Sequence, residues 1–84
     1  MSFILSILFV SFSWAGPKCT DQPKDTWQDQ EKFKKDLISK GYKIKKFKVT
    51  SGDCYELYGW DKDQNKVEIY FNPITAEIVK KKNW

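Results

Sequence analysis

The chain has 84 residues, with 15 lysines against 11 acidic residues and a formal net charge of +4. A chain of this length forms one domain at most. It contains no histidine, which excludes histidine-based triads and histidine metal ligands. It also contains no arginine, and its lysines are interleaved with acids, which is not typical of a nucleic-acid-binding protein.

The first segment, residues 1–15, reads MSFILSILFVSFSWA and carries no charged side chain. Small residues at Ser13 and Ala15 follow an apolar run, which is typical of a signal peptide cleaved before Gly16. The basic residues that usually begin a signal peptide are missing. An uncleaved anchor is the alternative, but this run is shorter than the roughly 20 residues that span a bilayer. We therefore expect a periplasmic or secreted protein.

An extended arm, residues 16–26, follows, with two prolines and several turn-forming residues. The arm contains Cys19, and the second cysteine of the chain is Cys54. In an oxidising compartment such a pair is expected to form a structural disulfide. A redox-active pair, the alternative, is typically spaced Cys-x-x-Cys at the start of a helix. The folded domain is predicted to cover residues 27–81.

A helix is predicted over residues 28–40, with Thr26 or Asp29 as its N-terminal cap. Acidic residues near its start and lysines near its end suit the helix dipole. Its apolar stripe contains Phe33 and Leu37, four residues apart. We expect Trp27 to cover the start of the helix and Gly41 to end it in a left-handed conformation.

From Tyr42 the apolar residues alternate, which indicates a strand. The pair Lys45-Lys46 interrupts the alternation, and a β-bulge there would restore it. Three further strands are predicted: Cys54–Trp60, Lys66–Phe71 and a short one at Ala76–Lys80, followed by a frayed KKKNW end. The predicted fold class is α+β, with one N-terminal helix packed on a three- to four-stranded antiparallel sheet.

The segment after the second strand begins with Asp61, Asp63 and Asn65 on alternate positions, as a calcium-binding loop does. Such a loop requires glycine at its sixth position and a bidentate glutamate at its twelfth. Those positions hold Lys66 and Asn72 here. We therefore expect a hairpin loop whose Asp and Asn side chains accept local backbone hydrogen bonds. No metal and no cofactor is predicted.

Taken in order, several short motifs resemble the PepSY domain family. They are Gly41-Tyr42, Tyr55-Glu56, the Asp-rich turn, the VEIYFNP run at residues 67–73, and Thr75 with Glu77. The resemblance covers about residues 27–79. It implies a helix packed on an antiparallel sheet and no catalytic residues. It also implies a peptidase-inhibiting or regulatory role, which has been proposed for the family, with a peptidase as one possible partner.

The chain departs from the family pattern at three places. Asn72 stands where the family commonly has Asp before the proline, and Ala76 stands where it has Gly after the threonine. Gln64-Asn65 replaces the usual Asp-Gly of the hairpin loop. The departure at Ala76 leaves the geometry of that turn open.

Strand alternation predicts which side chains share a sheet face. Val67, Ile69, Phe71, Tyr55 and Leu57 are expected to face the helix. The opposite face is the candidate partner-binding face, and it is expected to show Lys46, Lys48, Glu56, Tyr58, Trp60, Glu68 and Tyr70. Two other interpretations stay open. The aromatic pairs stabilise a thin sheet, or the arm covers this face, because Cys54 has the outward parity.

The sequence predicts a non-enzymatic exported binding or regulatory module that acts through this face. The expected partner is another exported protein, with a peptidase suggested only by the resemblance, or a second copy of the chain in a homodimer. The alternatives are lysine-driven binding to a membrane or another polyanion, and a homodimeric structural protein. Lysines 43, 45, 46 and 48 also suit a solvated edge. Membrane contact after signal cleavage is not expected.

Overall fold

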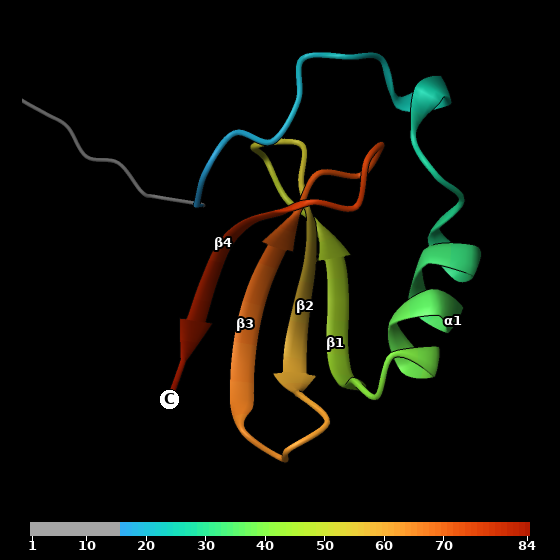
Figure 1. Ribbon diagram of the computed structural model, residues 1–84. Coiled ribbons are helices and arrows are strands. Elements are labelled where there is room, and N and C mark those ends of the chain that lie inside the picture. The colour runs from blue at the N-terminus through green and yellow to red at the C-terminus, as the bar shows by residue number, and fades with distance from the viewer. Residues whose placement is uncertain (1–15) are drawn as a thin grey trace, which may run out of the picture.

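The computed structural model describes residues 16–84, so the predicted signal peptide lies outside the described residues. Its elements are η1 (Lys24–Thr26), α1 (Gln30–Ser39), β1 (Lys43–Val49), β2 (Tyr55–Trp60), β3 (Lys66–Phe71) and β4 (Ile78–Asn83). The helix α1 packs on one face of a four-stranded antiparallel sheet with the order β1-β2-β3-β4, which confirms the predicted α+β fold (Figure 1). Within residues 16–84, no helix has the length and apolarity needed to cross a membrane.

The helix α1 is bounded by the residues that the sequence suggests. The Asp29 carboxylate accepts a hydrogen bond from the Lys32 backbone N–H at 3.0 Å, so Asp29 is the cap and Thr26 is not. Gly41 ends the helix with φ 99°, a conformation that glycine adopts without steric cost. The helix begins two residues later than predicted, at Gln30, because the capping residue Asp29 has non-helical backbone angles, φ −56° and ψ 134°.

The predicted β-bulge lies in β1. The register of β1 against β2 shifts between Ile44 and Lys46, so that Lys45 has no direct partner. The extra residue restores the phase, and Ile44, Phe47 and Val49 all pack against the core. The bulge therefore explains how one strand with a double lysine keeps its apolar side chains on one face.

The core lies between α1 and the inner face of the sheet. Leu57, Val67 and Ile69 are fully buried there. Aromatic rings pack around them at centroid distances of 4.9–6.0 Å, namely Trp27, Phe33, Phe47, Tyr55 and Phe71. The five residues predicted to face the helix all lie in this core, and Trp27 packs edge-on against Tyr55 at its margin.

The Asp-rich segment is the loop of the β2–β3 hairpin. One oxygen of the Asp61 carboxylate accepts hydrogen bonds from the backbone N–H groups of Asp63 and Asn65, each at 2.9 Å. These backbone donors hold the pKa of Asp61 below its usual value. The carboxylate organises the turn, which confirms the hairpin interpretation.

The last strand differs from the prediction. Ala76 takes the left-handed conformation, φ 67°, and its N–H donates to the Asn72 carbonyl at 2.9 Å. Because this turn extends past Ala76, β4 begins only at Ile78. The predicted frayed end was wrong, since Lys80, Lys81 and Lys82 pair with β3.

The two cysteines form the predicted disulfide, with an S–S distance of 2.00 Å. Cys54 is fully buried at the start of β2, and Cys19 lies on the arm. The Cys19 N–H donates to the Gly52 carbonyl at 2.9 Å, and the Cys19 carbonyl accepts from the Asn72 side chain at 3.2 Å. The disulfide and these two hydrogen bonds fix Cys19 to the end of the sheet, and Lys18 adds an ion pair with Asp53 at 3.2 Å.

Candidate functional site

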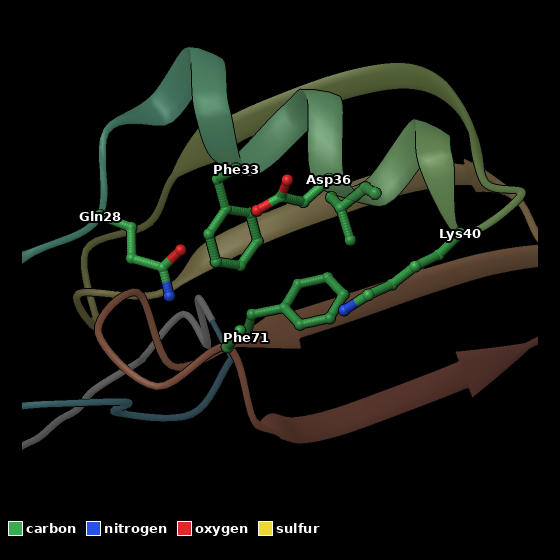
Figure 2. A pocket seen from close by; sticks show the side chains of 7 residues that line it. Gln28, Phe33, Asp36, Lys40 and Phe71 are labelled. Carbon is green, nitrogen blue, oxygen red and sulfur yellow. The ribbon is translucent and has the colours of Figure 1, made fainter.

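A small hollow lies beneath α1, between the helix and the inner face of the sheet. Figure 2 shows the Phe33 and Phe71 rings lining it beneath the helix, with Asp36 and Lys40 among the other lining residues. Its volume is about 30 Å³, the space that one water molecule occupies in the liquid. A hollow of this size does not take a small-molecule ligand, because ligand pockets measure some hundreds of Å³.

The outer face, defined as the sheet face turned away from α1, is arranged in three rows across the strands. Two rows run from β1 to β4 with a lysine at each end: Lys48–Glu56–Tyr70–Lys80 and Lys46–Tyr58–Glu68–Lys82. A third row holds Lys43, Trp60 and Lys66. All seven predicted face residues lie on this face, and lysines flank the carboxylates and aromatic rings at its centre.

The outer face holds the net positive charge of the protein. Counting Lys45, whose Nζ lies 5.9 Å from the Tyr58 ring centroid, it carries seven lysines against two glutamates. The remaining eight lysines and nine acidic side chains nearly cancel. Within residues 16–84, Lys48 is the one lysine of this face whose ammonium lies within 4.0 Å of a carboxylate. The lysine charges are thus largely unneutralised.

Aromatic rings of the outer face are covered by lysine ammonium groups. Lys43 lies over Trp60 at 5.6 Å from the ring centroid, and Lys66 lies 5.4 Å from both Tyr58 and Trp84. Such cation–π contacts hold a lysine stem along the ring while its charge stays in water. The face therefore presents positive charge on an aromatic layer.

A pair of carboxylates lies at the centre of this face. Glu56 on β2 and Glu68 on β3 are diagonal neighbours, since Glu56 pairs with Tyr70 and Glu68 pairs with Tyr58. Glu56 is only 6% exposed, with the Lys48 ammonium 3.7 Å from its carboxylate. Glu68 accepts a hydrogen bond from the Tyr70 hydroxyl at 3.0 Å.

The surroundings shift the pKa values of these groups in opposite directions. Burial and then the neighbouring Glu68 raise the pKa of Glu56 to about 7. Hydrogen bonding with Glu56 and Tyr70 lowers the pKa of Glu68. Burial, with the bond to Glu68, raises the pKa of Tyr70. Near neutral pH the pair can hold one proton between two carboxylates.

The arm covers one end of the outer face. Gly16 lies directly against the Tyr70 ring, and Pro17, Tyr70 and Lys80 surround a shallow depression there. The rows that contain Tyr58 and Trp60 lie farther from the arm along β2. The arm therefore covers the Tyr70 end of the outer face, and the rows of Tyr58 and Trp60 lie beyond it.

Sequence reasoning missed part of this surface. Lys66 was not assigned to it, and Lys80, Lys82 and Trp84 were not expected on it because the C-terminal end was predicted to be frayed. The sequence holds no signal that would have placed Lys80 and Lys82, because their faces depend on the register of β4 against β3. In the part of the chain that the structure describes, no three His, Cys, Asp or Glu side chains are placed to hold a metal ion.

Comparison with known proteins identifies the family. The family model described as "Peptidase propeptide and YPEB domain", a PepSY model, matches residues 1–82. The chain belongs to this family, whose members are propeptide-like regulatory or binding domains. Neither the search of curated proteins nor the search of solved structures found a match.

Proposed function

We propose that this protein is a non-catalytic, exported binding module that docks on another exported protein through its outer face. The observation that carries the proposal is the aromatic and lysine-rich surface on the side of the sheet that α1 leaves free. Tyr and Trp are the residue types that most often anchor protein interfaces. Family membership supports a regulatory role and makes a peptidase a natural partner to test first.

Export is part of the proposal. The disulfide between Cys19 and Cys54 and the propeptide family are consistent with an oxidising compartment outside the cytoplasm. The apolar segment at residues 1–15 supplies the predicted signal peptide.

The experiment is affinity capture with the full chain, expressed and processed in an exporting host. The wild type is compared with a Tyr58→Ser, Trp60→Ser double variant, using exported proteins of the source cells. The matched control is Ile38→Ser with Ile78→Ser, because both are exposed apolar residues, 58% and 49% exposed, outside the outer face. Thermal unfolding checks that all three proteins are folded.

A protein retained by the wild type and the control, but lost by the face variant, would support the proposal. If that protein is a peptidase, its hydrolysis of casein should slow when the wild-type domain is added. Equal capture by all three proteins, or no specific capture, would overturn the proposal.

A second candidate function is lysine-driven binding to an anionic surface such as a membrane or polyanion. The observation that favours it is the excess of seven lysines over two glutamates on one face. Binding of this kind weakens steeply with ionic strength, whereas an aromatic interface depends on salt much less.

A further inference from the structure

The charges on the outer face form a pattern that constrains what can bind there. The lysines lie mainly on β1 and β4 at the two sides, and Glu56 and Glu68 lie between them on β2 and β3. A uniform anionic plane, such as a lipid surface, would bring negative charge onto the central carboxylates. A partner with acids at the sides and a different group at the centre avoids that repulsion.

The centre of the face is also hollowed. A shallow depression of about 210 Å³ is lined by Lys46, Lys48, Glu56, Tyr58 and Glu68. A side chain entering it would meet the Glu56 and Glu68 carboxylates, the Tyr58 ring and the side chains of Lys46 and Lys48. A tyrosine suits this place, because its hydroxyl can donate to a carboxylate while its ring packs against another ring.

We propose that the outer face binds an acidic segment of a partner protein. The carboxylates of the segment lie against the outer lysines of β1 and β4. One aromatic, hydrogen-bond-donating side chain enters the depression, where Glu56 and Glu68 are the acceptors. This inference rests on the proposed function and specifies the chemistry of the partner.

The test uses simple probes and the full chain as processed in an exporting host. The probes are poly-L-glutamate, a glutamate–tyrosine copolymer, and vesicles of equal parts phosphatidylcholine and phosphatidylglycerol. Binding is measured at matched anionic charge, and NMR shifts map the contact. We expect the copolymer to bind tighter than poly-L-glutamate and both to bind tighter than the vesicles, with shifts concentrated on the outer face.

Two charge-matched variants locate the site. Lys46→Glu with Lys82→Glu reverses both ends of one row, and Lys24→Glu with Lys35→Glu makes the same change of net charge elsewhere. The first should weaken copolymer binding by at least about tenfold and the second by less than about twofold, because close charge pairs act locally at moderate salt.

Four results would overturn the inference: tighter binding to the vesicles, equal weakening by both variants, no advantage of the copolymer, or no polymer binding. A failure of this inference can be told apart from a failure of the proposed function. Suppose that the polymers do not bind but an exported protein is still captured through Tyr58 and Trp60 at high salt. The proposed binding module is then supported, and the acidic partner is refuted.

Discussion

Trp84 lies edge-on against Tyr58, with ring centroids 5.6 Å apart and an interplanar angle of 88°. Its backbone N–H donates to the Lys66 carbonyl at 3.1 Å, which fixes the last residue beside β3. The Lys82 ammonium lies 4.9 Å from the centroid of the same ring. Trp84 therefore extends the third row of the outer face, although 56% of it is exposed.

Replacing Trp84 by Ala should lower the free energy of unfolding by about 0.5–1.5 kcal/mol, the usual value of an aromatic pair. Urea unfolding measures the loss. Trp84→Phe is the control, since it keeps a ring at this position and should lose less. Equal losses in the two variants would show that the ring contact with Tyr58 contributes nothing.

Reduction of the Cys19–Cys54 disulfide should lower the melting temperature without abolishing the sheet signal in circular dichroism. The bond joins residues 35 apart in the sequence. The chain-entropy estimate for such a loop is about 3–4 kcal/mol. The core residues remain in place, so the sheet should survive. Thiol titration of unreduced exported protein should find no free thiol, and finding two would contradict the bond.

Truncating the central core should cost far more than truncating the surface. Leu57→Ala and Ile69→Ala should each lower the free energy of unfolding by about 2–5 kcal/mol, because both side chains are fully buried. Ile38→Ala, on the exposed side of α1, should change it by less than about 0.5 kcal/mol. Chemical unfolding of the three variants measures these values. A neutral Leu57 or Ile69 variant would contradict the packing of α1 on this face.

The stability of the protein should fall as the pH rises from about 4.5 to about 7. The pKa of Glu56 rises from 4.5 to about 7 on folding, so the folded state binds this proton more tightly than the unfolded chain. The lowered pKa of Glu68 acts in the opposite sense, since its contribution is present above the ordinary value and is lost as the pH falls. The net decline should therefore be clearest toward pH 7.

Glu56→Gln should remove most of this decline, because the amide imitates the protonated carboxyl. The variant should be more stable than the wild type at pH 8 and about equally stable at pH 5. Glu77→Gln, an exposed position in the turn before β4, should keep the wild-type pH profile. Urea unfolding at both pH values tests this, and parallel profiles for wild type and Glu56→Gln would refute it.

The fold could be predicted because its signals are local. A cap at Asp29, a stop at Gly41 and alternating apolar residues in β3 each specify an element within a few residues. The bulge at Lys45 could also be predicted from the sequence, since the alternation of apolar residues changes phase there.

The excess of lysines on the outer face could not be predicted in the same way. Lys80, Lys81 and Lys82 are consecutive, and a run of identical residues has no period to show which face each one occupies. Their faces are set by the register shift opposite Tyr70 and Phe71, where Val79 has no direct partner. Likewise, the burial of Glu56 depends on neighbours from β1 and β3 that are distant in the sequence.

The separation of charge has a consequence for the kinetics of encounter. With the lysine excess on one side and a nearly neutral remainder, the molecule has an electric dipole that points through the outer face. An anionic partner approaching within about one Debye length, about 10 Å at 0.1 M salt, exerts a torque that turns this face toward it. Salt should then act mainly on the association rate and leave the lifetime of the complex nearly unchanged.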